Sequence, residues 1–92
     1  MIILERFTLE AGEVQDFDIP FTDYLAQLSD TGLSHIIVAD AGVTINSSTL
    51  TSGVVKVWVT GLTKGTNNVI TAELTTTGGR VHFGSIKVKV RS

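Results

Sequence analysis

Cysteine is absent from the 92-residue sequence, and proline occurs once, as Pro20. Without cysteine the chain can form no disulfide, thiolate nucleophile, iron–sulfur cluster or cysteine zinc site. No Pro/Gly/Ser tract marks a flexible linker. No apolar run approaches the ~20 residues that span a bilayer, and Met1 to Leu9 lacks the basic and long apolar regions of an export signal. We therefore expect neither a membrane partner nor a linker between domains.

Charged side chains are also scarce. They make up 17% of the sequence, with seven basic and nine acidic residues and a formal net charge of −2. This sign is wrong for a protein that binds phosphate backbones, so we expect no nucleic-acid partner. The length predicts one domain, residues 1–92. A domain of this size buries only about two thirds of its unfolded surface, so partner contacts would add useful stability.

The composition favours strands. Threonine, valine and isoleucine supply 13, 11 and 8 residues, and β-branched side chains suit a pleated, half-buried surface. Short alternating segments recur at roughly ten-residue spacing, with turn signals between them. The pattern predicts an all-β, antiparallel, immunoglobulin-like β-sandwich of about seven strands, with one short helical turn near Phe21–Leu28. A closed barrel is the alternative arrangement.

Three segments, 14–21, 68–77 and 81–91, alternate as strands with one buried face do. Their predicted inward residues are Phe17, Ile19, Phe21, Ile70, Ala72, Leu74, Ile86, Val88 and Val90. Gly78-Gly79 between the last two segments can take positive φ values and predicts a tight hairpin. In the segment 54–60, valines occupy both parities, and we expect both faces to be largely covered.

Other segments are less regular. Leu33 to Ala39 contains three consecutive apolar residues at 36–38, which indicates a strand covered on both faces or lying in a sandwich core. Val43 to Asn46 is a short strand, and the polar stretch Ser47 to Ser52 indicates a connection with room for an edge strand around Leu50. Thr22 is the predicted cap of the helical turn.

Residue types that perform catalysis or bind metals are few and dispersed. His35 and His82 are the only histidines, and neither has a second histidine at metal-ligand spacing. Asp16, Asp18 and Asp23 could supply oxygen ligands to calcium, but no calcium-loop motif accompanies them, so a solvated strand face is favoured. Nucleophile-elbow, Walker and dinucleotide-binding motifs are missing. We predict no catalytic, cofactor-binding or metal-binding residues and no enzyme activity.

Contact surfaces are the remaining candidates. Trp58, the single tryptophan, lies between two valines, and it is either a core aromatic, which is favoured, or an interface anchor. Lys87, Lys89 and Arg91 line one face of the last strand, where a solvated face is favoured over a basic binding patch.

The N-terminal run is a ragged strand with Ile3, Phe7 and Leu9 on one parity. It is either the first strand of the fold, which is favoured, or an arm that pairs with the sheet edge of a neighbour. We therefore treat residues 1–15 as an N-terminal strand or arm. If it is an arm, deleting Met1 to Leu9 should weaken assembly more than folding.

The C-terminal half carries a pattern that resembles a known family. Its elements are Gly53 before a strand, Trp58 within it, the loop Gly61 to Gly65, Thr75-Thr76 at a strand end, the turn Gly79-Arg80 and a last strand ending in Arg91. Upstream, Phe17-Asp18-Ile19 and Phe21 to Leu25 fit the same pattern. Over about Asp16 to Ser92, the chain resembles small immunoglobulin-like virion proteins of tailed bacteriophages, and Met1 to Gln15 lies outside the pattern.

The resemblance implies a non-enzymatic virion structural protein, an adaptor that joins tail fibres to the tail or neck through protein–protein contacts. It implies other virion proteins as partners, several copies in a symmetric assembly, and a place on the virion exterior after assembly in the host cytoplasm. Arg80 then joins Ile3, Phe7, Leu9 and Trp58 as a candidate contact residue. A capsid decoration, cement or head-fibre protein is one alternative, and a bacterial surface immunoglobulin-like binding module is another.

Overall fold

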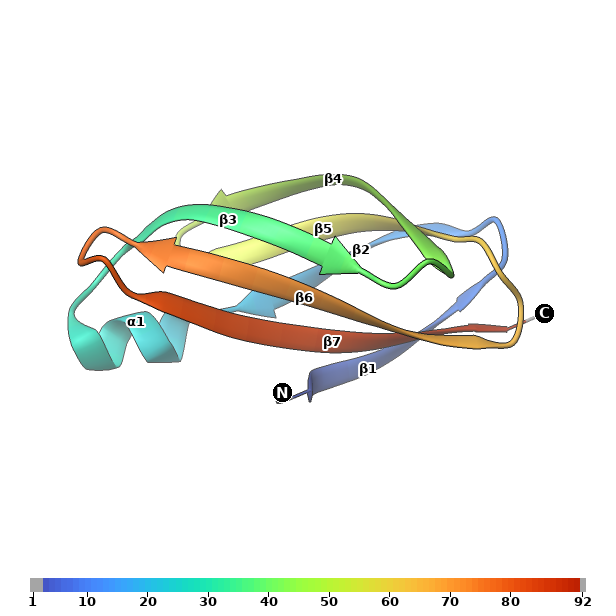
Figure 1. Cartoon of the computed structure of the whole chain (residues 1–92), viewed down its shortest axis with the longest axis horizontal. Helices are drawn as coiled ribbons and strands as arrows, with labels where there is room; N and C mark the ends of the chain where they lie inside the picture. The colour runs from blue at the N-terminus through green and yellow to red at the C-terminus, as the bar shows by residue number, and fades with distance from the viewer. Residues whose placement is uncertain (1–2, 92) are drawn as a thin grey trace.

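The computed structural model describes residues 3–91, and the side chains of Ile3 and Leu4 lie outside the described part. Seven strands and one short helix follow one another along this part of the chain (Figure 1). They are β1 (Ile3–Glu10), β2 (Val14–Pro20), α1 (Thr22–Leu28), β3 (Gly32–Ala39), β4 (Val43–Thr51), β5 (Val54–Gly61), β6 (Thr66–Thr76) and β7 (Val81–Arg91). The predicted all-β class, the strand number and the helical turn are confirmed.

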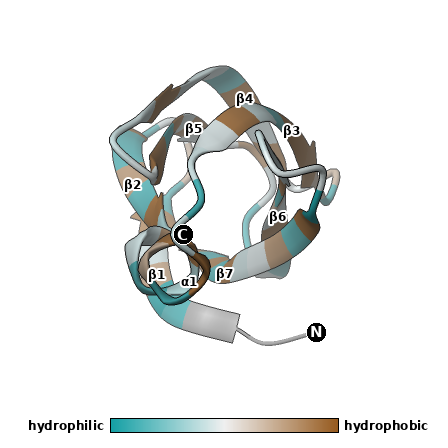
Figure 2. Ribbon diagram, turned by 90° about the vertical axis from the view of Figure 1, so that its left-hand side faces the viewer, coloured by the Kyte–Doolittle hydropathy of each residue, from teal (hydrophilic) through white to brown (hydrophobic). Residues whose placement is uncertain are grey.

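The strands form two sheets that pack face to face. One sheet has four strands in the order β1-β7-β6-β3, and the other has three in the order β2-β5-β4. Seen along the long axis, the two sheets enclose the interior from opposite sides (Figure 2). No strand pairing joins the sheets within residues 3–91, so the arrangement is a sandwich, consistent with the immunoglobulin-like class, and not a closed barrel.

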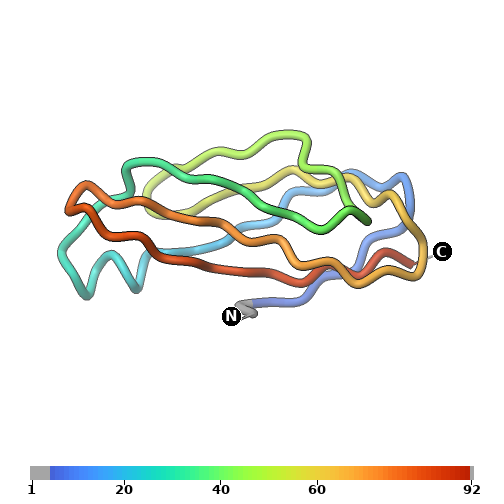
Figure 3. The backbone as a smooth tube through the Cα atoms, viewed as in Figure 1, coloured from blue at the N-terminus to red at the C-terminus, as the bar shows by residue number. Residues whose placement is uncertain are grey.

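One strand pair departs from the antiparallel expectation. β1 runs parallel to β7, whereas the other four ladders are antiparallel. The tube drawing shows the first and last strands lying side by side (Figure 3). A parallel pair requires a long crossover, and here the whole remaining fold provides it because the two strands are the first and last of the chain.

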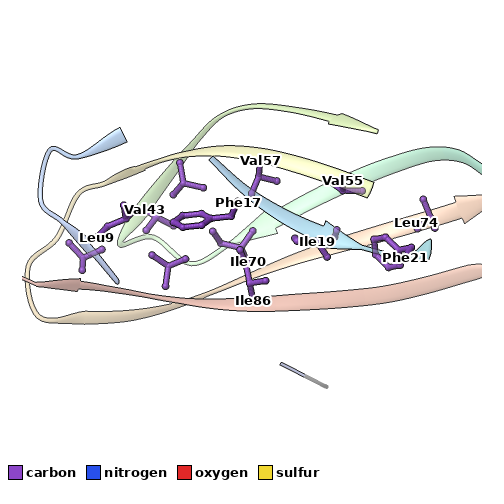
Figure 4. Packing of buried hydrophobic residues seen from close by; sticks show 14 of the residues in the cluster. Leu9, Phe17, Ile19, Phe21, Val43, Val55, Val57, Ile70, Leu74 and Ile86 are labelled. Carbon is purple, nitrogen blue, oxygen red and sulfur yellow. The ribbon is translucent and has the colours of Figure 1, made fainter. Parts of the chain in front are cut away.

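The core is built from the inward parity of each strand, as the alternation predicts. Its fifteen buried hydrophobic residues are Leu9, Phe17, Ile19, Phe21, Leu25, Val43, Val55, Val57, Val59, Ile70, Ala72, Leu74, Ile86, Val88 and Val90. In the close-up, side chains from β2 and β5 point toward those from β6 and β7 (Figure 4). Hydrophobic burial between the sheets is therefore the main force that fixes their relative position.

The third strand is not covered on both faces, and that prediction is wrong. β3 is an edge strand that pairs with β6 alone, and Ile36 and Val38 are 59% and 62% exposed. The inward parity, which includes Ile37, is only partly buried. Alternate side chains of the apolar run therefore face the core, and the others face solvent.

The fourth strand is longer than predicted. β4 continues through the polar stretch after Asn46, and its ladder with β5 shifts register between Ile45 and Ser47. This irregularity is a β-bulge, which lets a strand continue where the alternation of its side chains is interrupted. The polar residues therefore lie on an edge strand, as predicted around Leu50, and not in a connection.

The short helix begins at Thr22, one residue earlier than a Thr22 cap requires. Phe21 occupies the N-cap position and makes no side-chain capping bond, so the predicted cap at Thr22 is wrong. Phe21 and Leu25 are buried, whereas Leu28 is 38% exposed. The helix thus forms because two apolar residues close one end of the sandwich, without help from a polar cap.

The hairpin between β6 and β7 spans residues 77–80. Gly79 has a φ of +87°, and Gly78 is outside the positive-φ region, so only one of the two glycines supplies the left-handed conformation. This turn and the loop after α1 lie at the same end of the sandwich, opposite the C-terminus (Figure 1).

Candidate protein–protein interface

The histidines take structural positions. The His35 Nε2 atom lies 2.9 Å from the Ser48 hydroxyl, which links β3 to β4 across the sheet edges. His82 stacks on Tyr24 with ring centroids 3.7 Å apart and an angle of 3° between the planes. Within the described residues, no three His, Cys, Asp or Glu side chains gather as a metal site, and no helix is long and apolar enough to cross a membrane.

A groove of about 650 Å³ opens beside α1, between the start of β3 and the turn after β4. Its apolar lining includes Leu25, Leu33 and Leu50, and its two ionisable side chains are Asp30 and His35. Asp30 accepts a hydrogen bond from Arg80, and His35 is hydrogen-bonded to Ser48, so both side chains already have partners within the fold. The groove therefore brings no nucleophile, base and orienting carboxylate together in one hydrogen-bonded chain.

The acidic residues of β2 are held by a lysine. Lys56 Nζ lies 2.9 Å from a carboxylate oxygen of Asp16 and 3.2 Å from one of Asp18, across the β2–β5 ladder. The hydrogen bond from Lys56 lowers the pKa of Asp16, and the bonds to Asp16 and Asp18 raise the pKa of Lys56. Two of the three carboxylates considered for calcium, Asp16 and Asp18, thus form an ion-pair network on the sheet surface, whereas Asp23 lies on α1.

Trp58 projects from the outer face of the three-stranded sheet. It lies on the central strand β5, with Asp16 of β2 on one side and Ser47 of β4 on the other, and it is 42% exposed. The favoured core placement is wrong, and so is the expectation that both faces of this strand are largely covered. The inward valines of β5 are small enough to fill the space between the sheets, which leaves the tryptophan parity outside.

The side chains around Trp58 include an ion pair and an exposed valine. We call Trp58 together with Val14, Asp16, Ser47 and Lys56 the tryptophan face. Its ion pairs hold the Lys56 side chain, and Val14 adds apolar surface because it is 53% exposed. A large aromatic ring surrounded by ordered polar groups has the anatomy of an interface anchor with its polar rim.

Arg80 stabilises one end of the sandwich through an ion pair. Its guanidinium donates to Asp30 at 2.9 Å, and the Asp30 carboxylate also accepts bonds from Thr77 and from the backbone of Thr31 and Gly78. Hydrogen bonding from the Thr76 hydroxyl, aided by these other donors, holds the pKa of Asp30 well below its usual value although burial opposes the shift. Arg80 thus joins the β6–β7 turn to the loop after α1.

The N-terminal candidates lie within the fold. Ile3 begins β1, and its side chain is outside the described part. The Phe7 ring packs on Phe17 with centroids 4.3 Å apart, and Leu9 is fully buried. Residues 3–10 therefore form a strand of the sandwich, so the favoured interpretation holds and the arm is not what the structure describes.

A second exposed cluster was not predicted from the sequence. Val81 and Phe83 of β7 are 51% and 58% exposed, and they share the outer face of the four-stranded sheet with Ile36 and Val38 of β3. Glu73 of β6 pairs with both Ile36 and Phe83 and so lies between them. We call these four apolar residues the apolar patch. The parity of Lys87 and Lys89, extended back along the last strand, would have placed Phe83 outside.

The two surfaces point away from each other because they lie on the outer faces of opposite sheets. Fold and surfaces together define a small β-sandwich domain with the features of a protein-interaction module. The chain belongs to the family described as podophage GP4 fiber-tail adaptor protein gp77, whose model matches residues 10–89. The resemblance to phage virion proteins is thereby confirmed, and the matched region begins six residues before Asp16. A search of curated proteins found no match.

Proposed function

We propose that this protein is a non-enzymatic joint of a bacteriophage tail, which attaches fibres to the tail or neck through protein–protein contacts centred on Trp58. The family membership supports the adaptor role. The observation that carries the contact assignment is a 42% exposed tryptophan on the middle strand of the three-stranded sheet. Tryptophan is the residue type most enriched among those that dominate binding energy at interfaces.

An adaptor needs two separate surfaces, one for each partner. The tryptophan face and the apolar patch lie on the outer faces of the two opposing sheets, so two proteins can dock without competing for space. The buried core between them is continuous, and it transmits force from one face to the other without a flexible linker. We propose that several copies assemble in this way on the tail exterior.

Replacing Trp58 by alanine tests the proposal. The side chain is 42% exposed, so Trp58→Ala should lower the unfolding midpoint only modestly while reducing incorporation into particles about tenfold or more. Incorporation is measured by quantitative mass spectrometry of purified particles from a phage that lacks its own copy of the gene. Leu62→Ala is the matched control, because Leu62 is 52% exposed, belongs to neither surface and lies in the loop between β5 and β6. Full incorporation of the Trp58 variant would exclude this contact, and absence of the wild-type protein from particles would exclude the adaptor role.

A further inference from the structure

The parallel pairing of β1 with β7 creates a basic surface that neither strand has alone. The register places Arg6 opposite Lys87, and it places Thr8 opposite Lys89. These side chains line one shallow hollow on the outer face of the four-stranded sheet, together with Asn67 of β6. Arg91 follows on the same parity of β7. Four of the seven basic residues of a chain with a net charge of −2 thus gather on one face.

These four cations have no ion-pair partner among the described side chains. The ion pairs of residues 5–91 involve only Lys56 and Arg80, and Glu10, opposite Arg91, lies beyond ion-pair distance. Like charges placed directly opposite each other on neighbouring strands destabilise a sheet, as do Arg6 and Lys87 here. The cluster therefore adds no ion pair to the described part of the fold, and a bound anionic group would relieve its repulsion.

The neighbouring surface indicates what kind of anionic group would fit there. Along the outer parity of β7, Val81 and Phe83 of the apolar patch precede Lys87 and Lys89, so the apolar and basic regions follow each other along one strip, which is interrupted at the buried Ser85. A nucleic acid would match the cations and leave the apolar half of the strip uncovered, whereas a protein segment can match both halves. The cations of β7 recur every second residue, at roughly 7 Å intervals, which is also the spacing of alternate side chains in an extended acidic segment.

We infer that Arg6, Lys87, Lys89 and Arg91 form a docking surface for an acidic segment of another protein, with apolar residues of that segment covering the apolar patch. The inference deepens the proposed adaptor function by giving the second face a partner of defined chemistry. It rests on that function only for the statement that the partner belongs to the phage particle.

Titration of the full chain with short peptides tests the surface without using particles. The probes are a ten-residue peptide of alternating Glu and Thr, its Gln-Thr counterpart, and an oligothymidylate of similar length, measured by fluorescence anisotropy at low and high salt. The acidic peptide should bind more tightly than both other probes and weaken as salt rises. No preference for the acidic peptide over the neutral one would overturn the inference, and tighter binding of the oligothymidylate would assign the surface to nucleic acid.

Single charge changes locate the site. Lys89→Gln should weaken binding of the acidic peptide roughly threefold to tenfold, whereas Lys64→Gln, an exposed cation in the β5–β6 loop, should leave it unchanged. Lys87→Gln should also weaken binding while leaving the thermal midpoint unchanged or raised, because it removes the repulsion with Arg6. An equal loss from the Lys64 variant would show that binding follows net charge alone, and that result would overturn the inference. Because this titration needs no particle, its failure leaves the Trp58 test of the proposed function intact.

Discussion

At the scale of single residues, Asn68 shows how one polar side chain is tolerated in the interior. It is 2% exposed, and its amide oxygen accepts the backbone N–H of Gly42 at 3.1 Å. Its amide nitrogen donates to the Thr66 hydroxyl at 3.0 Å. No buried side-chain nitrogen or oxygen among the described residues lacks a hydrogen-bond partner. Asn68 therefore ties the β3–β4 turn to β6 and leaves no polar atom unsatisfied.

Removing this amide should be costly. Asn68→Ala leaves the Gly42 N–H buried without its acceptor, so we expect the free energy of unfolding to fall by about 1–3 kcal/mol. Urea unfolding followed by circular dichroism measures the change. Asn67→Ala is the matched control, since Asn67 is exposed and a change there should stay within about 0.5 kcal/mol. Equal effects of the two substitutions would contradict the structural role of Asn68.

Asp30 should make stability depend on pH at the acidic end. Its pKa lies below the ordinary value of 3.8 in the folded protein, so the ionised form stabilises the fold above that pH. This stability should be lost progressively as the pH falls below about 4, because protonation then favours the unfolded chain. In Asp30→Asn, the midpoint of thermal unfolding should be several degrees lower at neutral pH and should change less between pH 5 and pH 2.

Asp16→Asn provides the comparison for this pH dependence. The pKa of Asp16 is lowered too, but its side chain is 38% exposed, whereas that of Asp30 is 5% exposed, so solvent screens the Asp16 pair more strongly. The Asp16 variant should therefore keep most of the wild-type pH profile. An Asp30 variant that follows the wild-type curve throughout would show that the Asp30 cluster is not the acid-sensitive group.

The exposed position of Trp58 shows why the burial of a single residue is hard to predict from sequence. Valine occurs on both parities of β5, so hydrophobicity alone could not decide which side faces the other sheet. Packing against the opposing sheet determines which side faces inward, because Val55, Val57 and Val59 fill the space between the sheets. Candidate contact residues were thus predictable by type, but their exposure depended on packing between distant segments.

At the scale of elements, the strands with regular alternation were predictable. Over residues 16–19 of β2, 70–75 of β6 and 85–91 of β7, one parity is apolar and the other polar, so the period of two fixes both the structure and the buried face there. The edge position of β3 and the parallel pairing of β1 were not predictable in this way. Both depend on which strands become neighbours in a sheet, and that order is set by contacts far apart in the sequence.

Deleting the first strand should damage folding, in contrast to the expectation for an arm. Removal of Met1 to Leu9 takes away the ladder with β7, a fully buried leucine and the phenylalanine that packs on Phe17. We expect a large drop in the thermal midpoint, and Leu9→Ala alone should cost about 2–5 kcal/mol. Differential scanning calorimetry measures both changes.

An outward-facing residue of the same strand provides the control for this deletion. Thr8 is exposed, so Thr8→Ala should change the unfolding free energy by less than about 0.5 kcal/mol. If the truncated chain unfolds at the wild-type midpoint, β1 contributes nothing to the stability of the fold, and the N-terminal run would then be an arm and not a strand of the sandwich.

At the scale of the whole molecule, two sheets of unequal width present two unlike surfaces. The three-stranded sheet carries a tryptophan within a network of charges, and the four-stranded sheet carries a strip that is apolar at one end and basic at the other. Unlike faces on one rigid body suit a joint between two different proteins, because each face selects a partner by its own chemistry.

The central claim is that this domain works in the phage tail by burying its outer faces against other proteins. A cryo-electron microscopy reconstruction of the particle, at a resolution that shows side chains, tests it most directly. We predict that the domain lies between tail and fibre proteins, with the Trp58 side chain, 42% exposed in the isolated chain, covered by a neighbouring protein. A particle that lacks the domain, or one in which Trp58 faces open solvent, would contradict the claim.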